Sequence, residues 1–349
     1  MADARTTRRR FLAGAAAGIG TLAFPHVITR ARAASKNELV FVGFGGTYQE
    51  GQAKAYIEPF ERQTGIKVIQ TTGVDLAKLK AQVQSKNVEW DVVTLPDRLR
   101  YAAVRDDLLG RINFDIVKAE HILPEVVTEY VVGHVTLAML LTYGTKAYPS
   151  KAPRTWSDFW NPSAFPGPRG MYNNPAYSME IALLADGVPK DKLYPLDVQR
   201  AFKSLDRIKS NIPVWWSQFP QPGVLLKTGE ITMTPWTRTI TQVLEGDPLG
   251  FSYEGAVFTY EGWTVPKGAP HVENAMKFIN FALQPERQAE LTKYIAFGPT
   301  NRKALPLVDA KLRQLLPSDN MGKGVLMNGD YWGQNLQKVQ EQWNEWRLR

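Results

Sequence analysis

The chain has 349 residues, a formal net charge of +8 and no cysteine. The missing thiols exclude disulfides, thiolate metal sites and a cysteine nucleophile. Six of the 42 basic residues and one of the 34 acidic residues lie within residues 1–33, so the rest of the chain carries only +3 and lacks the basic footprint of a nucleic-acid-binding protein.

Residues 1–33 have the three-part layout of an export signal. Arg8 and Arg9 precede Phe11, a mildly apolar run follows, and Ala31-Arg32-Ala33 is an A-x-A cleavage site. The paired arginines are typical of the twin-arginine form of the signal. A membrane anchor would need ~20 unbroken apolar residues, and a basic tail on a cytosolic protein would not show this ordered layout. We expect the signal to be cleaved and the mature chain to work in the periplasm.

After the signal, strand-like and helix-like segments alternate, as in a parallel sheet covered by helices. In chain order we predict a strand from Glu38 to Phe44, a helix from Thr47 to Thr64, a strand from Ile66 to Gln70, a helix from Leu76 to Ser85 and a buried strand from Asp91 to Leu95. About 316 mature residues exceed what one hydrophobic core serves, so this α/β chain is predicted to form two lobes.

The first helix has clear boundary signals. Thr47 and Glu50 have the spacing of a capping box, and Gly65 follows the last helical residue. The helix start should lie at the carboxyl end of the first strand, where open α/β sheets bind ligands. The Gly43-Phe44-Gly45-Gly46 run is not a dinucleotide fingerprint, because Tyr48 occupies the sixth position.

Six segments carry a family resemblance through their order and spacing. They are FERQTGIKV (60–68), WDVV (90–93), TWSDFW (155–160), GEI (229–231), VPKGAP (265–270) and AMKFINF (275–281). Together they resemble the bacterial spermidine/putrescine-binding proteins within the large family of extracellular solute-binding proteins. The resemblance covers most of the mature chain and is specific for the family, not for one ligand.

This resemblance implies a two-lobed periplasmic-binding-protein clamshell of the type II kind, with a helix-covered mixed sheet in each lobe. The first lobe would hold residues 34–143 and the second 144–258, and residues 259–349 would contain the hinge return to the first lobe and the C-terminal helices. The crossovers near Leu141 to Gly144 and Phe258 to Val265 are then hinge candidates.

A C-terminal apolar stripe follows helical spacing. Leu336, Val339, Trp343 and Trp346 recur three or four residues apart, which predicts a helix that docks by this face. We assign the stripe to the core and give it no ligand role.

The resemblance also implies ligand-binding residues. Glu261 falls where the family's polyamine binders place an acid against a ligand ammonium, although it could instead cap a turn or pair with a surface lysine. Trp236 and Tyr48 match family aromatics, and a Trp face can take an ammonium by cation–π contact. Trp263, Trp216, Tyr177 and Asn174 are further candidates, yet any one aromatic is more often packing than ligand contact.

Departures from the family pattern point away from a long polyamine. Asn174 and Tyr177 stand where polyamine binders carry further carboxylates, and Thr259 replaces a family tryptophan. Several ammonium groups would each need a carboxylate. Arg238 adds a guanidinium fork that fits a carboxylate, so Glu261 and Arg238 would suit a zwitterion; Arg238 could equally pair with Glu261 or Asp97 in the empty protein.

These residues favour binding over chemistry. The sequence lacks G-x-S-x-G and H-E-x-x-H motifs and an adjacent tyrosine pair, which argues against a secreted hydrolase and an iron-binding protein. We therefore expect no catalytic residue, no metal and no cofactor. The predicted partners are a small amine or zwitterion and a separately encoded ABC permease and ATPase, with the protein itself a monomer; a signalling receptor as partner is the alternative.

Overall fold

A computed structural model describes residues 37–349, so the predicted export signal at residues 1–33 lies outside the described residues. The strands are β1 (Glu38–Gly43), β2 (Lys67–Thr72), β3 (Val92–Pro96), β4 (Leu109–Gly110), β5 (Val132–Gly144), β6 (Gly170–Tyr172), β7 (Val214–Trp216), β8 (Met233–Trp236), β9 (Leu249–Pro266), β10 (Gly298–Pro299) and β11 (Val325–Leu326). The helices are α1 (Gly46–Gln52), α2 (Glu58–Thr64), α3 (Leu76–Ser85), α4 (Asp97–Arg105), α5 (Trp156–Phe159), α6 (Pro175–Ala185), α7 (Val198–Ile208), α8 (Gln221–Thr228), α9 (Thr239–Leu244), α10 (Val272–Ala282), α11 (Pro285–Leu291), α12 (Ala310–Leu315), α13 (Pro317–Asn320) and α14 (Gly329–Leu348).

The predicted strand and helix order of the first part of the chain is confirmed. β1, β2, α3 and β3 lie within two residues of their predicted bounds. The predicted long helix is α1 and α2, joined by a π-helical stretch, Ala53–Ile57. Gly65 ends α2 in the left-handed conformation, with φ 70°, as its position after the last helical residue predicts.

The predicted capping box at the start of α1 is wrong. Gly45 is the N-cap, and no side chain caps the helix. The Gln49 side chain accepts a hydrogen bond from the Gly45 amide instead, at 2.9 Å. Gly45 and Gly46 have φ of 75° and 59°, which glycine adopts at little cost. A sharp turn of two glycines, not a capping side chain, therefore begins α1.

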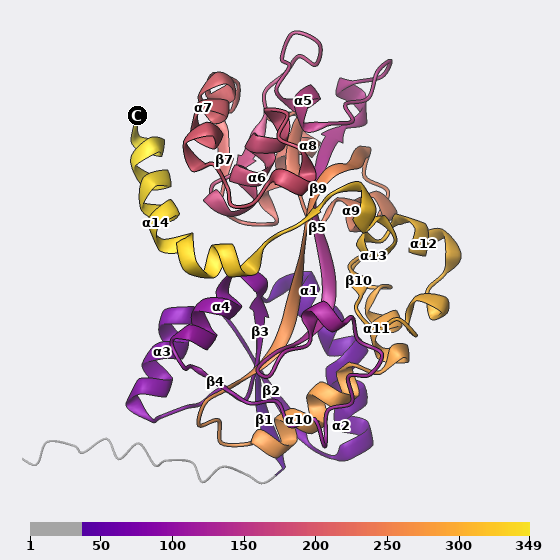
Figure 1. The fold of residues 1–349 in the computed structure, drawn as a ribbon. Coiled ribbons are helices and arrows are strands. Elements are labelled where there is room, and N and C mark those ends of the chain that lie inside the picture. Colours follow the sequence, from indigo (N-terminus) through magenta and orange to yellow (C-terminus); the bar gives the residue numbers. More distant parts are fainter. Residues whose placement is uncertain (1–36) are drawn as a thin grey trace, which may run out of the picture. The chain divides into compact units, whose positions relative to one another are not determined.

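A mixed sheet of nine strands runs through the molecule. Its order is β10-β5-β9-β3-β1-β2, with β4, β8 and β11 attached to its long strands. β1 pairs with β2 and β3 in parallel, as predicted, whereas β9 is antiparallel to β3 and β5. A separate mixed sheet in each lobe is predicted, but β5 and β9 are long enough to connect both ends of the molecule in one sheet, and within residues 37–349 only β6 and β7 form a second sheet. Figure 1 shows these two long strands running from one group of helices to the other.

Two large hydrophobic clusters lie at the two ends of these long strands. The first core contains Phe41, Phe60, Trp263 and Phe278 and joins β1, α2, β9 and α10. The second core contains side chains of α5, α6, α7, β7 and β8, and those of α14 as well.

The C-terminal stripe is a core face, as predicted. Val339, Trp343 and Trp346 are buried in the second core, and Leu336 packs partly buried against it. Figure 1 shows α14 passing from α4 toward α7. The lobe boundaries stay a prediction.

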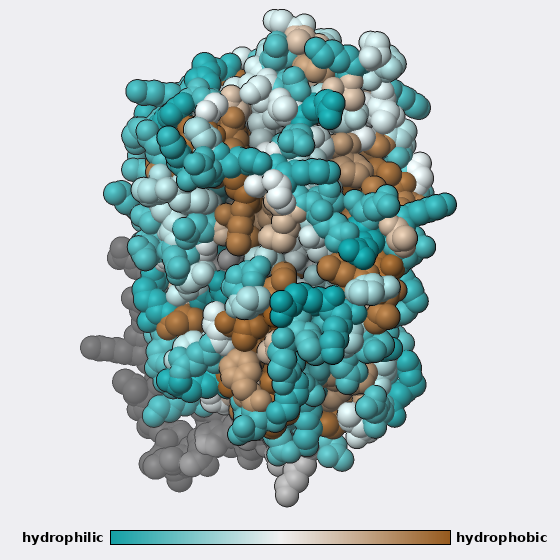
Figure 2. Space-filling model, turned by 45° about the vertical axis from the view of Figure 1, so that its right-hand side comes forward, coloured by the Kyte–Doolittle hydropathy of each residue, from teal (hydrophilic) through white to brown (hydrophobic). Residues whose placement is uncertain are grey.

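The face drawn in Figure 2 is mainly polar, with apolar side chains in separate patches. Among the described residues, no helix is both long enough and apolar enough to cross a membrane.

Candidate functional site

A cavity of about 300 Å³ lies where residues from both ends of the long strands meet. Its walls come from the ends of β1, β3 and β8, from β5 and β9, and from the loops after β7 and before β10. The lining residues are Phe44, Gly45, Gly46, Tyr48, Pro96, Arg98, Leu137, Tyr177, Gln218, Phe219, Pro220, Thr237, Arg238, Glu261 and Phe297. The predicted ligand crevice at the carboxyl end of β1 is therefore part of this cavity.

Four of the eight predicted ligand residues line the cavity together: Tyr48, Tyr177, Arg238 and Glu261. Tyr48 comes from α1 and Glu261 from β9, whereas Arg238 is the N-cap residue of α9 and Tyr177 lies in the first turn of α6. The tertiary structure thus collects side chains that are up to 213 positions apart in the sequence.

Glu261 is the only carboxylate among the residues that line the cavity. Its Oε2 atom is buried and has no hydrogen-bond partner. Burial raises the pKa of Glu261 to about 7, although the Tyr48 hydroxyl, Arg98 and Arg238 act in the opposite direction. A buried carboxylate oxygen without a partner is costly, so the site is arranged to receive a hydrogen-bond donor, and a cation would satisfy both its charge and its lone pair.

Two guanidinium groups face the same cavity. Arg98 and Arg238 both line it, and no hydrogen bond or ion pair of either side chain occurs among the described residues. Burial lowers the pKa of Arg238, against the opposing effect of Glu245 and Glu261. The expected alternative, an Arg238–Glu261 ion pair in the empty protein, is not formed, and the side chain of Asp97 lies outside the described part of the chain.

Tyr177 has an unusual backbone conformation for a residue with a side chain. Its φ is 74°, and it sits with Ala176 in a non-helical kink within the first turn of α6. Such strain in a non-glycine residue costs of order 1–3 kcal/mol and clusters at ligand sites. The surrounding fold therefore holds the Tyr177 ring at the cavity at some expense in stability.

The three predicted tryptophans do not line the cavity but pack behind it. Trp216 donates from Nε1 to Thr234 at 2.8 Å, and Trp236 donates to the Phe219 carbonyl at 2.7 Å. Trp263 lies in the first core. Because Trp236 holds the backbone of Phe219, which lines the cavity, its contribution to the site is indirect.

Asn174 is also used structurally. It is the N-cap of α6, where its side chain accepts a hydrogen bond from the Ala176 amide at 3.0 Å. An Asn in this position satisfies a free helix amide. It does not appear among the lining residues.

Several lining residues are absent from the sequence prediction, namely Arg98, Phe44, Phe219 and Phe297. Arg98 could have been found, because it follows the predicted strand that becomes β3, and strand ends border ligand sites in α/β sheets. Phe44 belongs to the glycine-rich run Gly43–Gly46 at the end of the first predicted strand. Phe219 and Phe297 come from loops, whose approach to the cavity no local pattern indicates.

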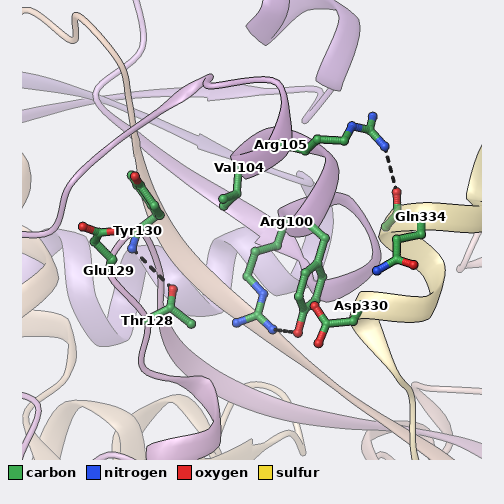
Figure 3. A pocket seen from close by; sticks show the side chains of 10 residues that line it. Arg100, Val104, Arg105, Thr128, Glu129, Tyr130, Asp330 and Gln334 are labelled. Carbon is green, nitrogen blue, oxygen red and sulfur yellow. Dashed lines mark hydrogen bonds between the residues drawn. The ribbon is translucent and has the colours of Figure 1, made fainter.

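A larger cavity, of about 570 Å³, lies between α4, residues 128–130 and the start of α14. Figure 3 shows Arg105 reaching toward α14. Arg105 donates to the Gly333 carbonyl at 3.0 Å, and Arg100 donates to the Tyr101 hydroxyl at 2.8 Å. Its arginines already have protein partners, so the smaller cavity around Glu261 is the candidate ligand site.

No group of three or more His, Asp or Glu side chains within residues 37–349 could hold a metal ion. The cavity therefore offers binding groups, namely one acid, two guanidinium groups, hydroxyls and aromatic rings.

Comparison with known proteins supports this view. A family model described as bacterial extracellular solute-binding protein matches residues 55–315. The gamma-aminobutyric acid-binding protein of Pseudomonas aeruginosa is 32% identical over 330 residues, which cover 90% of this chain and 92% of that protein. The spermidine/putrescine-binding periplasmic protein of Salmonella typhimurium is 23% identical over 293 residues, covering 78% and 82% of the two chains.

The fold has close counterparts among solved structures. AgtB, a binding protein from A. tumefaciens R10 in complex with agropinic acid, is 38% identical and superposes with a TM-score of 0.81. The match covers 89% of this chain and 99% of that chain. The α/β fold is thus that of the periplasmic binding proteins.

Proposed function

Because the chain belongs to the bacterial extracellular solute-binding proteins, which bind solutes and are not enzymes, we propose that its cavity captures a small amino acid-like zwitterion for an ABC importer. The ligand carries an ammonium group at one end and a carboxylate at the other, as 4-aminobutyrate does. A separately encoded permease and ATPase take it from the binding protein.

The observation that carries the proposal is a set of charged groups around one cavity that have no ion-pair partner among the described side chains. Glu261 has a buried oxygen without a partner, and Arg98 and Arg238 line the same space. A ligand ammonium satisfies Glu261, and a ligand carboxylate takes the guanidinium donors, which bind such groups in a planar, bidentate way. The rings of Phe44 and Phe219 then cover the methylene groups between the two ends.

Polyamines fit this charge pattern less well. Glu261 is the single acid among the lining residues, and two arginines stand beside it. A diamine or triamine would leave at least one ammonium group without a carboxylate and near a like charge, which is unfavourable in a cavity shielded from water. The similarity to a gamma-aminobutyric acid-binding protein over 90% of the chain agrees with the zwitterion.

Binding would proceed by closure of two lobes. Tyr48 belongs to the first core and Tyr177 to the second, while Glu261 lies on β9 and Arg238 at the start of α9, and both line the same cavity. A ligand that bridges these groups favours the closed form, and a shift from 1:99 to 99:1 requires about 5.5 kcal/mol of differential binding. The hinges are expected where the pairing of β5 and β9 is irregular, between Met139 and Leu141, close to the predicted crossover that begins at Leu141.

Export of the protein completes the proposal. The twin-arginine signal in residues 1–33 would send a folded monomer to the periplasm, where the closed form is recognised by the permease.

The test is isothermal titration calorimetry of the protein from residue 34 onward with four ligands that differ by one group. They are 4-aminobutyrate, butyrate without the amine, butylamine without the carboxylate, and putrescine with two amines. We expect 4-aminobutyrate to bind at least 100-fold more tightly than each of the others, because each of them leaves a buried charge unpaired. At 100 times its Kd it should also stabilise the fold by about 2.7 kcal/mol in thermal melts.

Variants identify which end each residue holds. Arg238→Ala should weaken 4-aminobutyrate binding about 100-fold but leave the weak butylamine binding unchanged. Glu261→Gln should likewise weaken 4-aminobutyrate binding but leave the weak butyrate binding unchanged. Glu254→Gln, an exposed acid on the same strand as Glu261, is the matched control and should change neither. Tightest binding of putrescine, with Arg238→Ala neutral, would overturn the zwitterion in favour of a polyamine.

A further inference from the structure

A buried histidine lies directly behind the ligand cavity and is not among its lining residues. His134 is fully buried on β5. It stands between Gly133, which pairs with Gly262, and Val135, which pairs with Glu261, so it is the extra residue of a β-bulge opposite the cavity acid. Bulges re-aim side chains and recur beside functional sites.

The imidazole is held by rings on several sides. It stacks on the Trp263 ring with 3.8 Å between centroids and an interplanar angle of 16°. The Tyr56 ring meets it edge-on at 6.2 Å. Its Nε2 lies 3.4 Å from the Tyr48 hydroxyl, whereas Nδ1 is buried without a hydrogen-bond partner. The only polar contact of His134 among the described residues is therefore with a tyrosine that lines the ligand cavity.

The imidazole is neutral, because burial lowers the pKa of His134 to about 3. A neutral ring carries one N–H. On Nδ1 that proton would be a buried donor without an acceptor, which native structures avoid most strongly. On Nε2 it faces the oxygen of Tyr48. With the proton on Nε2, the only unsatisfied atom of the ring is the acceptor Nδ1. The Tyr48 oxygen then accepts this hydrogen bond, and the proton of the Tyr48 hydroxyl is free to point to another acceptor.

The proton of the Tyr48 hydroxyl has one suitable acceptor, the carboxylate of Glu261. The Tyr48 hydroxyl and the Glu261 carboxylate line the same cavity, and Tyr48 acts to lower the pKa of this acid against its burial. Arg98, Arg238 and Tyr177 are the other titratable groups that face Glu261. Tyr48 and Tyr56 are the titratable groups that face His134.

We propose that His134 is a positioning residue of the ligand site: its Nε2–H donates to Tyr48, so that the Tyr48 hydroxyl donates to Glu261 and keeps that carboxylate ionised and facing the cavity. The inference rests on the proposed function, in which Glu261 holds the ligand ammonium. The chain His134–Tyr48–Glu261 counteracts the burial of the acid, because a hydrogen bond to the charged form of a carboxyl group lowers its pKa.

The first test needs no ligand. In protein labelled with ¹³C-glutamate, the Glu261 carboxyl signal is assigned with Glu261→Gln and titrated by NMR. His134→Phe keeps an aromatic ring but removes the donor, so the pKa of Glu261 should rise by about one unit. His134→Gln retains an N–H donor and should stay near the wild-type value. The exposed histidine variant His121→Gln is the control and should have no effect.

Coupling through Tyr48 distinguishes a hydrogen-bonded chain from simple packing. Tyr48→Phe alone should raise the pKa of Glu261 about as much as His134→Phe, and the double variant should add nothing further. An unchanged Glu261 titration in His134→Phe, or an effect of His134→Phe that persists in full in the Tyr48→Phe background, would overturn the proposal.

Ligand binding gives the functional readout. In His134→Phe the affinity for 4-aminobutyrate should fall close to tenfold at pH 6.5 and match the wild type at pH 9, where Glu261 is ionised in both. A structural role alone would weaken binding equally at both pH values. If 4-aminobutyrate binds to none of the proteins, the proposed ligand fails, while the NMR titration still decides the role of His134.

Discussion

Glu261 concentrates the chemistry of the site in one titratable group. It lies on β9 opposite Pro96 of β3 and Val135 of β5, a central position that removes water from one side of the carboxylate. Burial is the main reason that its pKa rises to about 7. A carboxyl group that titrates near neutral pH makes ligand capture sensitive to the acidity of the surroundings.

Affinity for an ammonium-bearing ligand should fall as pH drops below 7. Only ionised Glu261 pairs with the ammonium, so the apparent Kd should rise by up to about tenfold per pH unit between pH 7 and 5. Calorimetry at pH 7 in buffers of different ionisation enthalpy should show release of about half a proton. In Glu261→Gln the weak remaining affinity should not vary with pH in this range; a pH-independent wild type would contradict the ionisation of Glu261 as the cause.

The raised pKa of Glu261 also makes the stability of the fold depend on pH, in the direction opposite to that of ligand affinity. The folded-state pKa lies above the value of 4.5 expected without burial, so the folded protein binds more protons than the unfolded chain between about pH 4.5 and 7. The contribution of Glu261 to the free energy of unfolding therefore falls as pH rises through this window. Glu261→Gln should melt no lower than the ligand-free wild type at pH 8, since it removes a buried, unpaired charge.

Among the elements, α14 is fixed to the second core by its tryptophans. Trp332 donates from Nε1 to the buried carboxylate of Glu180 at 2.5 Å, and the Tyr194 hydroxyl donates to the same oxygen at 2.6 Å. Trp346 donates to Asp206 at 2.7 Å. The helix thus supplies both apolar area and donors that a buried acid requires.

Loss of one such donor should destabilise the protein measurably. Trp332→Phe leaves Glu180 with one donor fewer, and burial already raises the pKa of this acid. We expect a loss of about 1–3 kcal/mol in the free energy of unfolding, measured by urea denaturation with circular dichroism. Trp215→Phe changes a half-buried indole of the second core that makes no hydrogen bond to an acid; an equal loss in both variants would show that packing alone stabilises this region.

At the scale of the whole molecule, α14 connects the second core with α4 outside the ligand cavity. Its tryptophans belong to the second core, while Gly333 lies against Tyr101 of α4, and Arg105 of α4 donates to the Gly333 carbonyl. A Cβ added at Gly333 would lie 2.3 Å from the Tyr101 Cβ. The absence of a side chain therefore permits this arrangement of the two helices.

Gly333→Ala should shift the lobes away from the closed form. Opening relieves the contact with Tyr101, so ligand affinity should fall about tenfold, as expected when the binding-competent fraction falls by that factor. Gly322→Ala is the matched control, because an added Cβ there meets no atom within 4 Å. Small-angle scattering of the ligand-free Gly333→Ala protein should show a larger radius of gyration; unchanged affinity would mean that the α4–α14 contact does not depend on closure.

The sequence by itself determined the local elements of this protein, because periodicity and glycine positions act within a few residues. β1, β2, β3 and α3 follow from apolar patterns, and Gly65 follows from the backbone conformation that ends α2. Motif order was enough to reveal the family. The family resemblance singled out the positions of Glu261 and Arg238, and their opposite charges predicted them as partners for the two ends of one ligand.

Only the tertiary structure decided which side chains meet at the cavity. Arg98 reaches it from the first turn of α4, and Phe219 and Phe297 reach it from two loops. The three candidate tryptophans turn away from it into the cores. Local sequence cannot separate an aromatic ring that packs from one that lines a cavity, since both are apolar and both are buried. That choice depends on side-chain direction at the ends of β5, β8 and β9, which long-range pairing and the bulge at His134 determine.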